Sequence, residues 1–289
     1  MTSVKEILVI NSLKKERKMK DSFSISRFWL LLRKDFVENK TALVIGSFAL
    51  FAAMSLLMII LSIFIDSPDK GGCLIGYVLE YLFGIGCAIS VSLSFSPMRT
   101  KQGRISMFTL PATTLEKYLE QIVVYIFGFA AVYAVCVELG ELVRCVIAPL
   151  VWGKESAGIY INHFAVLGTI KDAFNDIHLV EMGITGSKIF TICVLGVIAD
   201  LGIFTLGAVL WPKFSFIKTY AATYVIGIVF FIAFIVVASV VDITEPMIET
   251  LFSELLIVII VLQVLIAVAA FVAGYYLLKR KNVIHPTVF

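Results

Sequence analysis

Charged residues are scarce in this chain. Asp, Glu, Lys and Arg make up 16% of its 289 residues, whereas a soluble domain has about 25%. Hydrophobic residues make up 60%, and the mean hydropathy is +0.99. A soluble fold of this length cannot hide so much apolar surface, because its outside must stay wetted. The composition therefore excludes a soluble enzyme and a disordered chain, and it indicates a protein that crosses a membrane several times.

Motifs of enzyme chemistry are missing as well. The sequence contains no GxxxxGK[ST] motif, which a P-loop needs to bind ATP, and no GxSxG, HExxH or GxGxxG. Its three histidines lie outside the long apolar stretches, and its five cysteines show no CxxC spacing. The net charge of +3 is too close to neutral to indicate a nucleic-acid partner. We therefore expect no catalytic site, no cofactor, no metal site and no nucleic acid for this chain.

Long apolar stretches are abundant instead. Six of them are long enough to cross a bilayer, which takes about 20 residues of helix. They cover residues 41–65, 71–96, 121–148, 189–212, 219–241 and 255–278. All seven prolines fall between these stretches or at their ends, where no helical hydrogen bond is lost. We predict an all-α fold, with a polar N-terminal extension over residues 1–20 and a single domain of six transmembrane helices over residues 21–289.

Basic residues are distributed unevenly between the connections. Nineteen of the 24 Lys and Arg residues lie before the first apolar stretch, in the connections 97–120 and 213–218, or after the last stretch. An excess of Lys and Arg marks the cytoplasmic side of a membrane protein. We therefore predict that both termini and the 97–120 loop are cytoplasmic, and that the long loop 149–188 lies on the opposite side of the membrane.

Two of the predicted cytoplasmic segments carry helical patterns. Residues 21–40 place apolar side chains at helical spacing with charged side chains on other faces, which is typical of an amphipathic helix along the membrane surface. In the 97–120 loop, Thr113 and Glu116 have the spacing of a capping box, which predicts the start of a short helix.

Two carboxylates fall inside the predicted spans. Asp200 lies near the middle of residues 189–212, and Glu80 lies about one turn from the middle of residues 71–96. Such groups are costly in hydrocarbon and normally face a bundle interior or a cavity. Two roles stay open for them: a neutral carboxyl that hydrogen-bonds across helices, or a place on a substrate or proton path.

Glu80 belongs to a ridge of small residues on one helix face. The ridge consists of residues spaced four apart, namely Gly72, Gly76, Glu80, Gly84, Ala88 and Ser92. Small residues let helix backbones approach closely in lipid. We therefore predict that the small residues Gly72, Gly76, Gly84 and Ala88 pack against a second helix, and that Glu80 lies in that seam.

Glu141 and Arg144 are expected at the level of the lipid headgroups. The rise of a helix that starts near Gln121 crosses the ~30 Å hydrocarbon core just before them. The segment 138–144 contains two Glu and one Arg, as does an element of intramembrane CAAX-type proteases, but here the spacing is wrong and the intramembrane histidines that such a site needs are missing. Glu141 and Arg144 lie three residues apart, and this spacing predicts an ion pair, solvated or half-buried.

The order of these elements resembles the membrane subunits of type 2 ABC exporter-permeases. That family has a cytoplasmic amphipathic elbow helix, two spans, a cytoplasmic coupling helix and four more spans, and here residues 22–39 match the elbow. The segment 108–117 is similar to the Leu-Pro-x-Ser/Thr…Glu-Lys element of bacterial permeases of this kind. The resemblance implies a coupling region that consists of Leu110, Pro111, Thr113, Thr114, Glu116 and Lys117.

The function that this resemblance implies is that of a permease subunit without its own ATPase. A separate ATP-binding subunit would dock beneath the 97–120 loop. Two copies, or one copy and a paralogous permease, would form a pathway through the lipid of a bacterial inner membrane. Two alternatives stay open: a non-transporting membrane scaffold or immunity-type protein, and a proton-coupled secondary transporter that uses Glu80 and Asp200.

Overall fold

The computed structural model describes residues 23–64, 68–153, 159–161, 186–240 and 245–281, which form helices and their connections and contain no strand. Five helical segments are long and apolar enough to cross a membrane. They lie in α2 (Ile25–Leu61), the run Thr114–Trp152, α8 (Gly186–Leu210), α9 (Ser215–Val240) and α10 (Glu245–Lys281). A sixth helix, α3 (Pro68–Leu93), is apolar over its described part Val78–Leu93. The prediction of a multi-pass helical membrane protein is confirmed.

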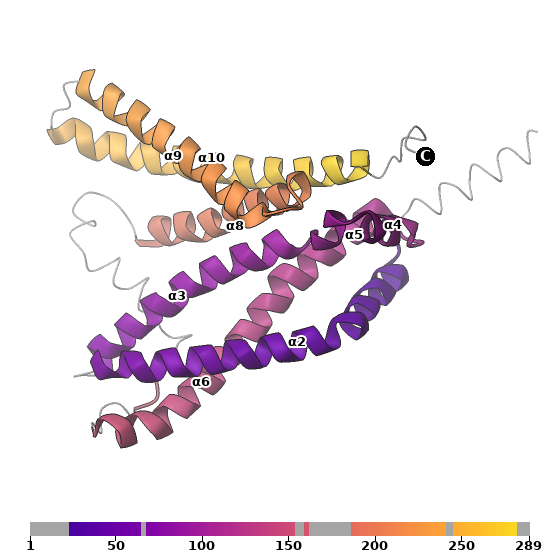
Figure 1. The fold of residues 1–289 in the computed structure, drawn as a ribbon. Coiled ribbons are helices and arrows are strands. Elements are labelled where there is room, and N and C mark those ends of the chain that lie inside the picture. Colours follow the sequence, from indigo (N-terminus) through magenta and orange to yellow (C-terminus); the bar gives the residue numbers. More distant parts are fainter. Residues whose placement is uncertain (1–22, 65–67, 154–158, 162–185, 241–244, 282–289) are drawn as a thin grey trace, which may run out of the picture.

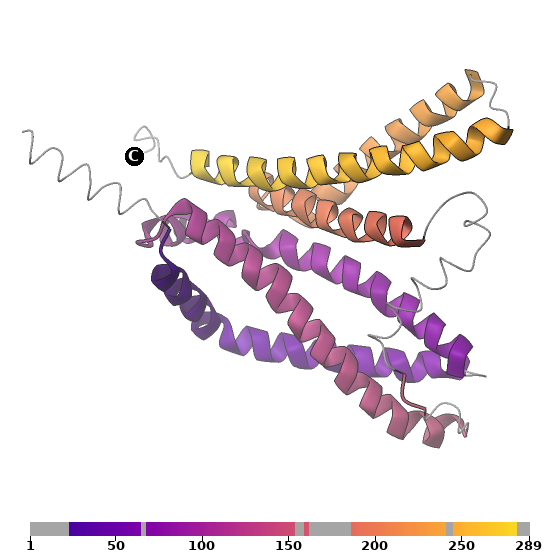
Figure 2. The same cartoon turned by 180° about the vertical axis from the view of Figure 1, so that it is seen from behind.

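The helices form two groups that meet at one end of the molecule (Figures 1 and 2). In the first group, α2 packs on α6 (Phe129–Trp152) with α3 beside them, and in the second group α8 packs on α10 and contacts α9. The two groups approach each other where the short helices α4 (Lys101–Thr109) and α5 (Thr114–Ile122) lie, and they diverge toward the opposite end. We call these two ends the α4–α5 end and the open end.

A cluster of buried side chains holds the α4–α5 end together. It combines Met107 of α4 and Tyr118 of α5 with Val209 of α8 and Leu278 of α10. Next to this cluster, the Lys281 ammonium group donates a hydrogen bond to the Val209 carbonyl at 2.5 Å, which satisfies a backbone acceptor near the end of α8. The two helix groups are therefore fixed to each other at this end.

The predicted surface helix is not a separate element. The sequence predicts a helix over residues 21–40 and a span over residues 41–65, whereas α2 runs without a break from Ile25 to Leu61. Its sequence contains no proline and only one glycine, so nothing in it ends the helix. Figure 1 shows a bend in the first part of α2, where the junction was expected. The predicted polar extension, residues 1–20, lies outside the described residues.

The third predicted span is longer than expected. α5, a π-helical stretch (Val123–Gly128) and α6 follow one another without a break, and the helix ends at Trp152 instead of residue 148. Pro149 therefore lies one turn inside α6, where the sequence had placed it after the helix. Its missing N–H removes one helical hydrogen bond, and the helix continues for only three residues beyond it. Gly153, with a φ of 64°, then terminates the helix.

Candidate functional site

The helix α5 starts with the predicted capping box, which is confirmed. The Thr113 hydroxyl accepts a hydrogen bond from the Glu116 amide at 3.2 Å, and the Glu116 carboxylate accepts one from the Thr113 amide at 2.8 Å. These bonds satisfy backbone donors that the first turn of a helix leaves without partners. Local sequence therefore determines where α5 begins.

The carboxylate of Glu116 also holds the start of α2. Glu116 is fully buried, and its Oε1 atom accepts hydrogen bonds from the Ser24 amide at 2.7 Å and from the Arg27 guanidinium at 3.1 Å. One side chain thus joins the first turns of α2 and α5. The capping spacing and the family element both pointed to Glu116, but neither indicated these partners.

Two residues that follow Glu116 anchor α5 to other helices. Lys117 is buried and donates a hydrogen bond to the Phe108 carbonyl in α4 at 3.3 Å. The Tyr118 hydroxyl donates one to the Phe271 carbonyl in α10 at 2.9 Å, and the Tyr118 ring stacks on Phe95 with centroids 6.1 Å apart. α5 is therefore a link between α2, α4 and α10.

The structure divides the predicted coupling residues into two sets. Glu116 and Lys117 are buried, so they shape the loop from within and offer no surface to a partner. The others are accessible in different degrees: Pro111 is exposed, and Leu110, Thr113 and Thr114 are partly exposed.

α4, which the sequence did not single out, offers an accessible surface at this end. Ile105 is 60% exposed although it is apolar, and the neighbouring Lys101 and Arg104 are exposed as well. Leu115 of α5 is 37% exposed. Apolar side chains framed by cations suit contact with a protein partner. The sequence signal for this surface is Ile105 directly after a basic residue, in a short segment whose other apolar residues are Met107 and Phe108.

The two intramembrane carboxylates lie on open helix faces. Glu80 in α3 and Asp200 in α8 are both exposed, and neither makes a hydrogen bond or an ion pair with a described residue. The expectation that Glu80 lies in a seam between helices is not met within this chain.

The ridge around Glu80 is closed at some positions and open at others. Gly76 and Ala88 are buried, as predicted for packing positions, but a Cβ atom on Gly84 would meet nothing within 4 Å. Gly72 lies where no side chain is described. The predicted close packing fails at Gly84 because α3 diverges from α8 toward the open end, as Figure 1 shows.

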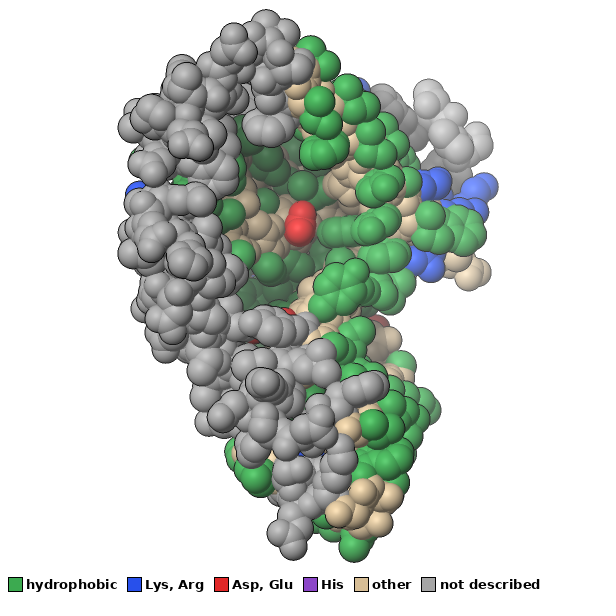
Figure 3. Space-filling model, turned by 90° about the vertical axis from the view of Figure 1, so that its left-hand side faces the viewer, with side chains coloured by type: hydrophobic (Ala, Val, Ile, Leu, Met, Phe, Trp, Pro, Cys, Tyr) green, Lys and Arg blue, Asp and Glu red, His purple; other side chains and the backbone are tan. Residues whose placement is uncertain are grey.

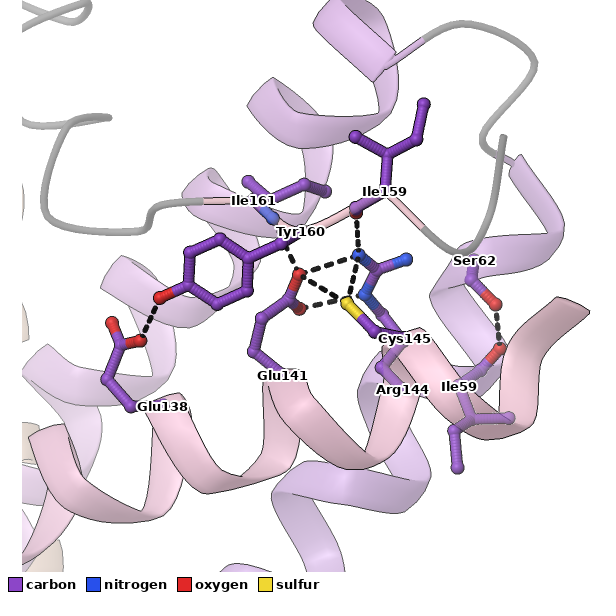
Figure 4. A network of polar contacts seen from close by, with 9 residues as sticks. All are labelled: Ile59, Ser62, Glu138, Glu141, Arg144, Cys145, Ile159, Tyr160 and Ile161. Carbon is purple, nitrogen blue, oxygen red and sulfur yellow. Dashed lines mark hydrogen bonds and ion pairs between the residues drawn. The ribbon is translucent and has the colours of Figure 1, made fainter. Parts of the chain in front are cut away.

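Glu141 and Arg144 form a buried network on α6 near the open end (Figure 4). Both side chains are fully buried, and Arg144 donates hydrogen bonds to the two oxygens of Glu141 at 2.8 and 2.6 Å. Arg144 also donates to the Ile159 carbonyl at 2.6 Å, while the Ile161 amide donates to Glu141 at 2.8 Å. The expectation of a solvated or half-buried pair is wrong, because residues 159–161 lie against it.

Tyr160 extends this network. Its hydroxyl donates a hydrogen bond to Glu138 at 2.5 Å, and this bond to a carboxylate raises the pKa of Tyr160 to about 12. The network therefore ties residues 159–161 to α6 at several points (Figure 4). Most of the predicted outer loop, including residues 162–185, lies outside the described residues.

Comparisons with known proteins do not identify this chain. No protein-family model, no curated protein and no solved structure matches it. Within the part of the chain that the structure describes, no group of three or more His, Cys, Asp or Glu residues is placed to hold a metal ion. A functional conclusion therefore rests on the residues of the chain itself.

Proposed function

We propose that this chain is the membrane permease subunit of an ATP-driven transporter, and that a separate ATP-binding subunit docks on the α4–α5 end. The observation that carries the proposal is the exposed surface of α4. There the exposed Ile105 follows Arg104 directly and lies one turn after Lys101, on a helix backed by the buried cluster at this end. The chain has no P-loop of its own, so ATP acts through a contact of this kind.

The proposal places the α4–α5 end in the cytoplasm. The distribution of basic residues supports this, since 19 of the 24 lie in segments on that side. Both termini are then cytoplasmic, the first part of α2 acts as the elbow at the membrane surface, and α3 completes a set of six spans. The resemblance to bacterial permeases favours an inner-membrane location and a pathway built from two copies or from a copy and a paralogue.

The contacts of α5 offer a route by which a partner moves the spans. A displacement of α5 acts on α2 through Glu116 and on α10 through Tyr118. α2 and α10 belong to different helix groups (Figure 2). A shift at the α4–α5 end would therefore move both helix groups, which diverge toward the open end. A rigid-body gating motion requires such a coupled movement.

The test is to isolate the tagged chain with its ATP-binding subunit in mild detergent and to measure ATPase activity after reconstitution in liposomes. We expect Ile105→Glu to weaken the complex about tenfold or more, because the contact would desolvate a carboxylate. Ile105→Leu, the matched control, should leave the complex intact. Ile105 is 60% exposed, so neither substitution should change the stability of the chain by more than about 0.5 kcal/mol.

Two outcomes would contradict the proposal. In the first, no ATP-binding subunit co-purifies with the chain and reconstitution changes no ATPase rate. In the second, a subunit binds, but Ile105→Glu and Ile105→Leu bind it equally well, so that the α4 surface is not the docking site.

A proton-coupled secondary transporter is the second candidate. The exposed carboxylates of Glu80 and Asp200, which have no partner among the described residues, favour it. Proteoliposomes that contain the chain alone distinguish the two candidates. Transport driven by a pH gradient without ATP, and lost in the variant Glu80→Gln with Asp200→Asn, would support the secondary transporter.

A further inference from the structure

A cleft between α3 and α8 opens toward the open end. The two helices contact each other where Ala88 and Val91 pack with Phe204. From this contact they diverge in both views (Figures 1 and 2). Gly84 lies one helical turn closer to the open end than Ala88. A Cβ atom on Gly84 would meet nothing within 4 Å, so the space beside it is open. Figure 3, which looks at the open end, shows a hollow whose described lining is largely hydrophobic.

Both intramembrane carboxylates lie on the helix faces that lead to this contact. Glu80 is four residues before Gly84 on the ridge that ends at Ala88, and Asp200 is four residues before Phe204. Residues four apart share one face of a helix. Glu80 therefore lies about 12 Å along α3 from Ala88, in the direction of the open end. Asp200 lies about 6 Å along α8 from Phe204, in the same direction. An acidic side chain is visible within the hollow in Figure 3.

Among the described residues, no cation pairs with these carboxylates. Neither has an ion pair or a hydrogen bond with a described residue. The Lys and Arg residues of α3 and α8 are Lys70 and Lys188, each more than two helical turns away from the carboxylate on its own helix. An isolated carboxylate at this depth in a bilayer is costly, and it marks a substrate or ion site by default.

We propose that this cleft binds an organic cation with an apolar body, such as an amine or onium group on a hydrophobic frame. The positive group is attracted by Glu80 and Asp200, and the apolar body contacts the hydrophobic walls. This inference names the substrate class of the proposed transporter and rests on the proposed function in that respect. The binding itself requires no ATP-binding subunit.

The experiment uses the full chain alone in lipid nanodiscs, with tetraphenylphosphonium as the probe. Tetraphenylborate, an anion of the same shape, is the matched control ligand, and empty nanodiscs give the lipid background. We expect saturable binding of the cation above background, and about a tenfold or greater loss of affinity in the variant Glu80→Gln with Asp200→Asn. These substitutions keep the side-chain shape and remove the charge. Binding of the anion should not exceed background in either form.

A second variant tests the cleft without changing a charge. Gly84→Leu fills the open space beside the ridge, and because a Cβ atom there has no close neighbour, the chain should fold normally. We expect it to lose cation binding at an unchanged melting temperature. Gly46→Leu is the matched control, since it is the same substitution at an equally open position of α2, outside the cleft. It should leave cation binding intact.

The inference is overturned if no saturable cation binding is found, if the carboxylate variant binds as tightly as the unaltered chain, or if the anion binds as well as the cation. Proton uptake that depends on these carboxylates without cation binding would also overturn it. Because the assay contains no ATP-binding subunit, a negative result for cation binding does not bear on the docking proposal. Failure of docking likewise does not alter cation binding.

Discussion

At the scale of single residues, Glu116 is the side chain on which the junction of α2 and α5 depends. Its buried carboxylate accepts hydrogen bonds from the amides of Ser24 and Thr113 and pairs with Arg27. Glu116→Gln keeps the shape but removes the charge and one acceptor oxygen. We expect it to lower the free energy of unfolding by about 1–3 kcal/mol, measured by thermal unfolding of the purified chain in a fixed detergent.

The matched control for this prediction is Glu38→Gln. Glu38 pairs with Lys34 at 3.4 Å, but its side chain is 58% exposed. An exposed pair contributes less than about 1 kcal/mol, so this control should change the melting temperature little. Equal shifts for the two variants would refute the role of Glu116 as a buried tie between α2 and α5.

Residue-level predictions succeeded where the information was local. The spacing of Thr113 and Glu116 was enough to predict the capping box. The same was true of the pairing of Glu141 with Arg144. The contact of Glu116 with Arg27 joins segments far apart in the chain, and the burial of the second pair depends on residues 159–161. A single sequence carries no signal for contacts of that kind.

At the scale of helices, the contact between α5 and α10 depends on a glycine. A Cβ atom on Gly274 would lie 2.7 Å from the Tyr118 hydroxyl oxygen, which is held by its hydrogen bond to Phe271. Alanine is the better helix former by about 1 kcal/mol, but overpacking a buried contact costs about 1–3 kcal/mol. We therefore expect Gly274→Ala to destabilise the chain by about 1 kcal/mol in thermal unfolding.

Tyr118→Phe completes a double-mutant cycle for this contact. Alone it removes one hydrogen bond, at a cost of about 1 kcal/mol. In the double variant the hydroxyl that would clash with the methyl group introduced by Gly274→Ala is gone, so the combined loss should be smaller than the sum by about 1 kcal/mol. Strictly additive effects would show that Gly274 and Tyr118 do not constrain each other.

Helices were predictable where hydropathy alone determines them. The apolar spans of α8, α9 and α10 follow from runs with at most one charge, because bilayer thickness sets the length of a span. The helix α10 itself begins at Glu245, ten residues before the predicted start of its span. The junction near residue 40 was not predictable, since the polarity pattern changes there but no residue breaks the helix. α4 was missed because it is short and polar, and its start depends on Thr100, whose side chain accepts a hydrogen bond from the Gly103 amide.

At the scale of the whole molecule, the arrangement of the two helix groups follows from where packing is concentrated. The buried cluster joins α4, α5, α8 and α10 at one end, while α3 and α8 leave a cleft toward the other. The sequence did not predict this arrangement. α9 and α10 are apolar on all sides, so their faces do not specify which helix each packs against.

The orientation of the molecule decides whether a docking surface and a cation cleft work together. Single cysteines in place of Ile105, at the α4–α5 end, and Tyr160, at the open end, test it in a variant without native cysteines, since both positions are exposed. We expect a membrane-impermeant maleimide to label Tyr160→Cys in intact spheroplasts and Ile105→Cys only after permeabilisation, because the described segments at the α4–α5 end are rich in Lys and Arg. The reverse pattern would put the docking surface where no ATP-binding subunit reaches it. It would therefore refute both the orientation and the proposed function, and leave the cleft open to the cytoplasm.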